Sequence, residues 1–353
     1  MATPATLTTH PVVPNQRDLE EIARTMGTHQ ARALVDMYYA VQNFRMRAAN
    51  QKRALTEADE PTALMAWSFV RMEETEQNIA RFLSVWTKEQ PAARWMQTIT
   101  GIGPILSAGL LAHINIEMCP TVGHLWRFAG LDPTNRWLGK EGAEEAVKGS
   151  EAKLTPQEFT GLCKLLGRKP EGVWALSHKK GEEFGDYQQE DTITKKRIQS
   201  GLAKRPWNAK LKVLTWKLGK SFVMVSSKES DVYGKVYLAR KARELRLNEE
   251  GKCATQAAAI LKAKRWSSDT EARAAYEKGR LPLGHLDARA RRYAVKLFLA
   301  GLHEVMYFYK YGKLPPKPYI LTQPDHTHWF QAPNADVVPG LREAQEAARK
   351  GLL

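Results

Sequence analysis

The sequence predicts an all-α protein, and three observations lead to this fold class. Apolar residues in the first 90 positions recur at spacings of three and four, which is the period of an amphipathic helix, and no strand-like alternation interrupts them. Residues typical of helix starts, and Gly or Pro residues typical of helix ends, then bound further segments along the chain. Hydrophobic residues make up 43% of the 353 positions, which is enough for a real core.

The first elements are predicted to be a flexible arm and a helical hairpin. Residues 1–14 are rich in Thr and Pro and are expected to form the arm. Residues 15–90 read as two long amphipathic helices, one up to about Lys52 and one that restarts at Pro61, forming a hairpin or an antiparallel coiled coil. We interpret Glu73, Glu74 and Glu76 as part of the solvated face of the second helix.

A short glycine-containing motif follows within residues 94–133. An apolar residue precedes Gly101-Ile102-Gly103, and an Ala/Leu-rich helix begins at Pro104, which is the pattern of a helix-hairpin-helix. Glycine lets another backbone come close, and the free N–H groups and dipole at the start of a helix suit a phosphate. We therefore predict DNA contacts without base readout at Gly101, Ile102, Gly103 and Ser107.

The rest of the chain is predicted to be helical around an insertion. A short helix from Thr121 ends at Gly130-Leu131-Asp132-Pro133, and residues 134–204 are expected to be an inserted subdomain of loops and helices. In the insertion, residues 135–155 read as a loop, and Thr155-Pro156-Gln157-Glu158 predicts a capping box. Residues 205–311 form a predicted basic helical domain, and 312–353 a Pro-rich tail with a short terminal helix. The helices expected in that domain are 206–225, 230–246, 253–264, 269–278 and 286–311.

The charge is large and concentrated. The chain carries 53 Lys and Arg against 38 Asp and Glu, a net charge of +15, which favours a polyanionic partner. Residues 195–246 hold 15 basic and 3 acidic residues, whereas residues 15–90 hold 10 and 11. Two basic helices are predicted to carry a cationic stripe that contacts the phosphate backbone. The residues assigned to this contact are Lys204, Arg205, Asn208, Lys212, Lys220, Arg289, Arg292 and Lys296.

Several other classes of protein are disfavoured. Cys119, Cys163 and Cys253 form no Cys-x-x-Cys pair, so neither a zinc finger nor a disulfide framework is expected. No apolar run of about 18 residues occurs, so we expect no membrane span, and residues 1–14 do not resemble a signal peptide.

Asp325-His326-Thr327-His328 is interpreted as a polar loop, so no metal or other cofactor is predicted. We interpret Trp207 and Trp216 as core residues rather than stacking platforms for bases. The expected location is cytoplasmic and nucleoid-associated.

Two blocks resemble a known family. Residues 94–133, with Phe128-Ala129-Gly130-Leu131-Asp132-Pro133 at their end, resemble the helix-hairpin-helix half of the C-terminal domain of DEDD-type insertion-sequence transposases, the group that includes the pilin-gene invertase. Residues 205–311 resemble the following part of that domain, through Trp207–Lys212 and Tyr233–Arg243. The resemblance implies a role in DNA recombination and a mobile-element origin.

The chain also departs from this family. A RuvC-like domain with metal-binding carboxylates precedes the coiled coil in the family, whereas the first 90 residues here resemble the coiled coil alone. The family places a serine soon after its Gly-Leu-x-Pro, and residues 134–139 contain none.

The resulting hypothesis is a non-catalytic DNA-binding protein that forms a homodimer through residues 15–90. Two alternatives remain open: an active transposase, recombinase or nuclease whose catalytic site is unrecognised or supplied separately, and a module that binds structured RNA.

Overall fold

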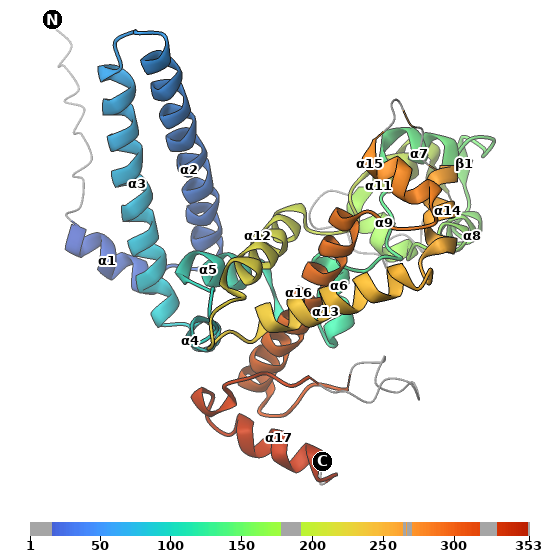
Figure 1. Cartoon of the computed structure of the whole chain (residues 1–353). Coiled ribbons are helices and arrows are strands. Elements are labelled where there is room, and N and C mark those ends of the chain that lie inside the picture. Colours follow the sequence, from blue (N-terminus) through green and yellow to red (C-terminus); the bar gives the residue numbers. More distant parts are fainter. Residues whose placement is uncertain (1–15, 178–191, 264–265, 267–269, 318–329, 352–353) are drawn as a thin grey trace, which may run out of the picture. The chain divides into compact units, whose positions relative to one another are not determined.

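The computed structural model describes residues 16–177, 192–263, 266, 270–317 and 330–351, and it has the predicted all-α fold (Figure 1). The described part contains one small sheet, in which strands β1 (Lys153–Leu154) and β2 (Ile193–Thr194) pair antiparallel. The chain divides into two compact units. The first unit comprises residues 1–98 and 102–114, and the second comprises 99–101 and 115–353.

The first unit contains the predicted helical hairpin. Helices α2 and α3 pack along each other, α1 packs on α3, and α5 packs against both α2 and α3. The indole of Trp86 is buried at the base of the hairpin, where its Nε1 donates to Met26 O at 2.9 Å. The bounds of the helices are α1 Gln16–Thr25, α2 Thr28–Glu57, α3 Ala63–Lys88, α4 Pro91–Gln97 and α5 Pro104–His113.

Two details of the hairpin correct the sequence-based expectations. The first predicted helix is broken at Gly27, whose extended backbone (ψ 168°) makes it the N-cap of α2. Glu76 is not on a solvated face: it is buried and accepts from Arg45 Nε at 2.6 Å and from Gln42 Nε2 at 2.9 Å. The sequence did not predict the burial of Glu76 because its partners, Arg45 and Gln42, lie on the other helix, more than 30 positions away.

The second unit is organised around the long helix α16 (Leu283–Tyr311). Helices α6 (Val122–Phe128), α12 (Ala209–Val225) and α13 (Tyr233–Glu249) all pack against it. Phe222, Tyr233 and Phe298 form the aromatic centre of this core, with ring centroids 5.1–5.8 Å apart. The remaining elements outside the insertion are η1 Ile116–Met118, α14 Ala254–Ala263, α15 Glu271–Glu277, η3 Ala335–Val337 and α17 Leu341–Arg349.

The described part of the insertion has a hydrophobic core of its own. Phe159, Cys163, Trp174, Ile198 and Leu202 are buried together in it. It contains α7 Gly139–Ala146, β1, α8 Pro156–Leu165, α9 Pro170–Ser177, β2 and α11 Lys195–Ala203.

One local expectation in the insertion is confirmed and one is wrong. The predicted capping box at α8 is present, with Glu158 N donating to Thr155 Oγ1 and Thr155 N donating to Glu158 Oε2. The expectation of a loop over 135–155 is wrong because α7 forms there and buries Ala143 against this core.

Some expectations fall on residues that are not described. These are the arm at 1–14, the segment 178–191 of the insertion, and the Asp325–His328 cluster. In the part of the chain that is described, no helix is long and apolar enough to cross a membrane.

Candidate nucleic-acid interface

The candidate site lies in the second unit, where the loop after α6 meets the start of α12. Gly130 has a positive φ of 68°, which ends α6 and turns the chain into residues 131–135. Asn208 N donates to Phe128 O at 2.9 Å, and Asn135 Nδ2 donates to Pro206 O at 3.1 Å. These two hydrogen bonds join segments more than 70 positions apart and fix the loop against the start of α12.

Two glycines allow the close approaches that shape the site. A Cβ atom on Gly130 would lie 2.8 Å from Trp207 Cγ and 2.9 Å from Lys212 Cδ. A Cβ atom on Gly219 would lie 3.3 Å from Val295 Cγ2, so α12 and α16 are in close contact there. Larger side chains at these two positions would push Trp207 and α16 outwards.

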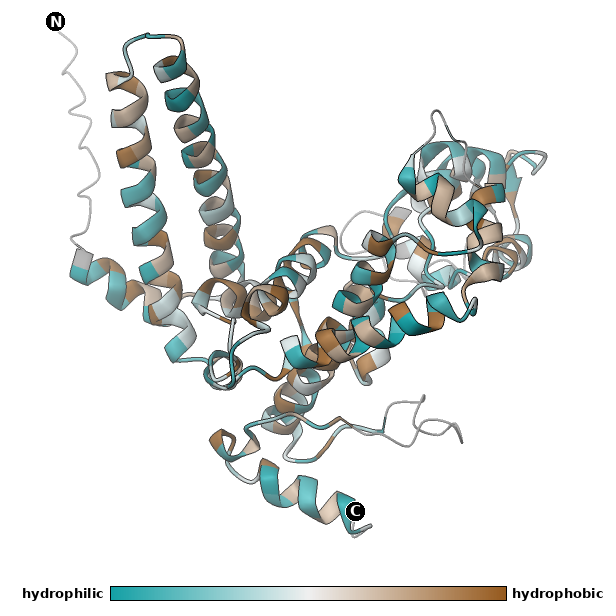
Figure 2. Ribbon diagram, in the orientation of Figure 1, coloured by the Kyte–Doolittle hydropathy of each residue, from teal (hydrophilic) through white to brown (hydrophobic). Residues whose placement is uncertain are grey.

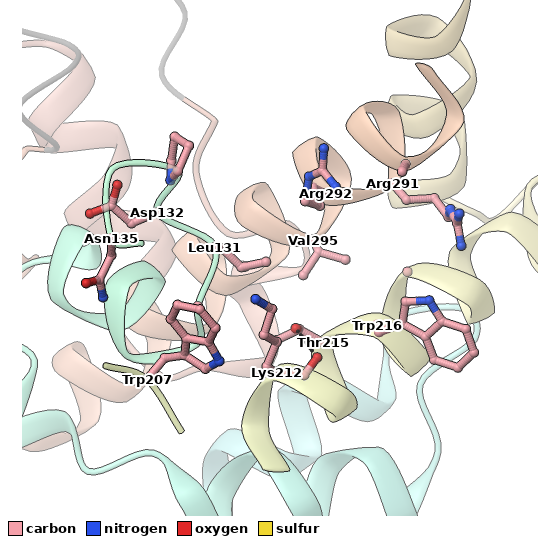
Figure 3. Close-up of a pocket in the computed structure, with 14 residues that line it drawn as sticks. Leu131, Asp132, Asn135, Trp207, Lys212, Thr215, Trp216, Arg291, Arg292 and Val295 are labelled. Carbon is pink, nitrogen blue, oxygen red and sulfur yellow. Dashed lines mark hydrogen bonds between the residues drawn. The ribbon is translucent and has the colours of Figure 1, made fainter. Parts of the chain in front are cut away.

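These three segments enclose a pocket of about 450 Å³. The loop supplies residues 130–133 and 135, α12 and its start supply Trp207, Lys212, Thr215, Trp216 and Gly219, and α16 supplies residues between 288 and 295. Figure 3 shows Lys212 between the two indoles, with Arg292 and Val295 above it. The pocket therefore combines apolar walls with several cationic groups.

The cations of this region are held by aromatic rings rather than by carboxylates. Lys212 Nζ lies 3.9 Å from the centroid of the Trp207 ring. Three further residues of the predicted site repeat this arrangement: Arg205 over Trp137 at 4.8 Å, Lys220 over Trp216 at 4.7 Å and Lys296 over Trp126 at 5.1 Å. Among the described residues none of these four forms an ion pair, and neither does Arg292. An aromatic ring stabilises a cation without neutralising it, so their charge stays available to an anion.

The pKa values of Lys212 and Lys296 are shifted towards the neutral form. Desolvation lowers the pKa of Lys212, and the neighbouring charges of Arg205 and Arg292 add to the shift. Desolvation also lowers the pKa of Lys296, against the favourable charge of Asp132. Both shifts would be relieved by a bound anion.

Other predicted site residues are occupied with structural contacts. Arg289 Nη1 lies 3.2 Å from Glu244 Oε2, so its charge is already compensated. Lys204 Nζ donates to Leu176 O, and Asn208 Oδ1 accepts from Leu211 N at 3.0 Å as the N-cap of α12. Sequence reasoning missed Arg291, which lines the pocket and pairs with Asp287 at 2.8 Å. The expectation that Trp216 is a core residue is wrong, because the residue is 54% exposed.

The Gly-x-Gly turn between α4 and α5 lies at the boundary of the two units. Gly101 has a positive φ of 90°, and its carbonyl accepts a hydrogen bond from Ser221 Oγ. Gly103 has an extended backbone, and open space surrounds the position of its missing Cβ. Ile102 and Ser107 are buried, and Ser107 Oγ donates to Gly103 O at 3.0 Å. Of the four residues predicted at this turn, Gly103 is therefore the one with room for a ligand beside it.

The model of the transposase IS116/IS110/IS902 family matches residues 93–152 of this chain. This segment is transposase-related. It includes the α4–α5 turn and the loop at 130–135, which forms one wall of the pocket, whereas α12 and α16 lie outside the match. The comparison with curated proteins gives no match, and neither does the comparison with solved structures. In the described part of the chain, no group of three His, Cys, Asp or Glu side chains could hold a metal ion.

Proposed function

We propose that this chain is a nucleic-acid-binding protein that holds DNA by its sugar–phosphate backbone. The observation that carries the proposal is the set of cations at and beside the pocket, above all Lys212, Arg292 and Lys296. Within the described part of the chain, no carboxylate lies within ion-pair distance of these three. A protein rarely gathers desolvated like charges unless a ligand of opposite charge completes the site. The match of the adjoining loop to a transposase family supports DNA as that ligand.

The Gly-x-Gly turn is proposed to add a second backbone contact. Pro104 has no N–H group and Ser107 N donates to Gly103 O, so the N–H groups of Ile105 and Leu106 remain as donors at the start of α5. With the positive end of the helix dipole, they suit one phosphate. Neither this contact nor the cationic pocket selects particular bases, so we expect binding with little sequence preference.

The salt dependence of DNA binding tests this proposal. Each neutralised phosphate contributes about −0.9 to the slope of log K against log salt, so binding should weaken steeply between about 50 and 200 mM. The variant Lys212→Gln and the variant Arg292→Gln should each bind DNA more weakly, and each should make the slope less negative by about one. Fluorescence anisotropy with a labelled duplex of mixed sequence measures both quantities.

The matched control for these variants is Arg342→Gln. It removes the same charge, but Arg342 lies on α17 and pairs with Asp336 at 3.0 Å. Its affinity and slope should equal those of the wild-type chain. A slope near zero in the wild-type chain would contradict DNA binding through phosphates.

Two further measurements separate this proposal from the alternatives. Incubation with supercoiled plasmid and Mg²⁺ or Mn²⁺ should leave the plasmid intact, and nicking or recombination would favour an active nuclease or recombinase. Competition at fixed salt between duplex DNA, branched DNA and structured RNA shows which of these nucleic acids the chain prefers. This measurement is needed because charge alone does not distinguish DNA from RNA.

A further inference from the structure

A second pocket adjoins the first in the same unit. It also has a volume of about 450 Å³, and it shares Trp207 and Asn135 with the first pocket as a common wall. Four cationic residues line it, namely Arg127, Arg168, Lys169 and Arg205. The two pockets therefore adjoin at Trp207 and Asn135, and cationic residues line both of them.

Arg168 is the most informative residue of the second pocket. It is 7% exposed, and its Nη1 donates to Arg136 O at 2.8 Å, yet no carboxylate lies within ion-pair distance of it among the described residues. Glu171 also lines this pocket but does not pair with Arg168. Burying a charge without a counter-ion is costly, so the site is incomplete without an anion.

The position of Arg168 is fixed by the backbone. Its N–H donates to Cys163 O at 2.8 Å, directly after the end of α8, and Gly167 before it has a positive φ of 62°. Desolvation lowers the pKa of Arg168, and the nearby charge of Arg127 lowers it further. The guanidinium is thus held in place next to a second cation, as in a site built for an anion.

The wall between the pockets offers both a ring face and a hydrogen-bond acceptor. Trp207 is half-buried, and Asn135 is 4% exposed with its Nδ2 donating to Pro206 O. Asn135 Oδ1 is buried and has no hydrogen-bond partner among the residues that the structure describes. Because a buried acceptor without a partner is unfavourable, a donor from a ligand would complete it. The ring N3–H of an unpaired thymine or uracil is such a donor, as is the exocyclic amino group of the other bases.

We propose that the two pockets are the binding track of an unpaired nucleic-acid strand, with adjacent nucleotides in the two pockets on either side of Trp207. Arg168 and Arg127 would hold one phosphate, Lys212 and Arg292 the next, and Asn135 would contact a base edge. A duplex cannot enter two such pockets, since its bases are stacked and their edges are paired. Cationic grooves interleaved with aromatic rings are characteristic of single-strand binding. This inference rests on the proposed function and adds the form of nucleic acid that the pockets accept.

The experiment compares a 12-residue oligothymidylate, an oligouridylate of the same length and a 12-base-pair duplex as ligands of the full chain. At equal salt, at least one of the single strands should bind about tenfold more tightly than the duplex. Changing Trp207→Ala should weaken binding of that strand on the order of tenfold, the effect of losing one stacked base, and change duplex binding less than twofold. Trp207→Phe should keep most of the affinity. Tyr311→Ala, an exposed aromatic truncation near the far end of α16, is the matched control and should change nothing.

Arg168 provides a second test that separates ligand binding from a structural role. Changing Arg168→Met should weaken strand binding several-fold and leave the melting temperature unchanged or higher, because it removes an uncompensated buried charge. A structural role for Arg168 predicts a lower melting temperature instead, and that result would overturn its assignment.

The outcomes distinguish the two levels of the proposal. Equal affinity for single strands and duplex, with no effect of Trp207→Ala or Arg168→Met, would overturn the strand track and leave phosphate binding standing. Loss of salt-dependent binding to every ligand would overturn both. If Trp207→Ala does not fold, the wild-type chain is photo-crosslinked to a single strand that contains thiothymidine, and the crosslinked residues are mapped. Crosslinks within 127–135, 168–176 or 205–216 support the track, and crosslinks confined elsewhere contradict it.

Discussion

A cation on the face of an aromatic ring has no negative charge beside it, whereas the charge of a cation beside a carboxylate is compensated. Lys212 on Trp207 is an example of the first arrangement, and Arg289 beside Glu244 of the second. Both residues were predicted to contact the phosphate backbone, each from its own basic helix, and their neighbours distinguish them. The sequence reveals how many cations there are, but the neutralising partner is 45 positions away in the chain and becomes visible only in the fold.

The two glycines of the α4–α5 turn should respond differently to substitution. Gly101→Val should destabilise the chain by about 1–3 kcal/mol, because Gly101 has a φ of 90° and its Cβ would lie 2.9 Å from Ser221 Oγ. Gly103→Val should leave stability nearly unchanged, since its backbone is extended and its surroundings are open. Thermal unfolding followed by circular dichroism measures this contrast.

The binding consequence of Gly103→Val tests the turn itself. If a phosphate approaches the start of α5, the added side chain should weaken DNA binding several-fold in a chain that is still folded. Normal binding by folded Gly103→Val would mean that the turn only connects two helices.

At the scale of elements, helix periodicity and capping were the reliable signals. The long helices of the hairpin follow from their apolar period, and the capping box of α8 follows from Thr155 and Glu158, which lie three positions apart. Helix α7 was missed because its sequence is rich in Gly, Glu and Lys, and its few apolar residues, Ala143 among them, pack against a core formed by distant segments. The pocket was missed for a similar reason, because it is built by three segments that meet only in the folded unit.

The hairpin should lose stability in acid because of Glu76. Burial disfavours the charged form of Glu76, but hydrogen bonds from Arg45, Gln42 and Tyr38 outweigh this and lower its pKa. A carboxylate whose pKa is lower in the folded state stabilises the fold above its unfolded pKa of about 4.5, and this contribution is lost as the pH falls through the folded value.

Substitution of this carboxylate provides the measurement. Glu76→Gln should cost about 1–3 kcal/mol at pH 7, and the difference from wild type should shrink at acidic pH. Glu74→Gln, which breaks an exposed pair with Arg71, is the matched control and should change stability by less than about 0.5 kcal/mol. Denaturant unfolding at pH 7 and at acidic pH checks both variants. Equal pH dependence in Glu76→Gln and wild type would contradict the assignment.

At the scale of the whole molecule, the positive charge is concentrated in one part of the chain. Residues 195–246 carry most of the positive charge, whereas residues 15–90 are nearly neutral. In the first unit, α2 and α3 expose large apolar side chains, and Figure 2 shows hydrophobic residues along both helices of the hairpin. Those on the described surface include Met37, Phe44, Leu64, Trp67 and Val70. A solvated hairpin with such a surface is typical of an interaction site.

We therefore expect the hairpin to join two copies of the chain. A second copy would bury these apolar side chains and would double the number of phosphate contacts that one assembly makes with DNA. Removal of residues 1–91 is an unsuitable test, because α5 packs against α2 and α3 and would lose its core. A point substitution at Trp67 should leave the fold of the hairpin intact, because this side chain is 64% exposed.

Sedimentation of the full chain at micromolar concentration provides the measurement. The wild-type chain should sediment as a dimer, and Trp67→Asp as a monomer, because a buried unpaired carboxylate would cost more than the contact provides. Met224→Asp places the same charge on an exposed apolar residue of α12 in the second unit and should remain dimeric. A monomeric wild-type chain would refute the dimer, and dissociation by Met224→Asp rather than Trp67→Asp would move the interface to the basic unit.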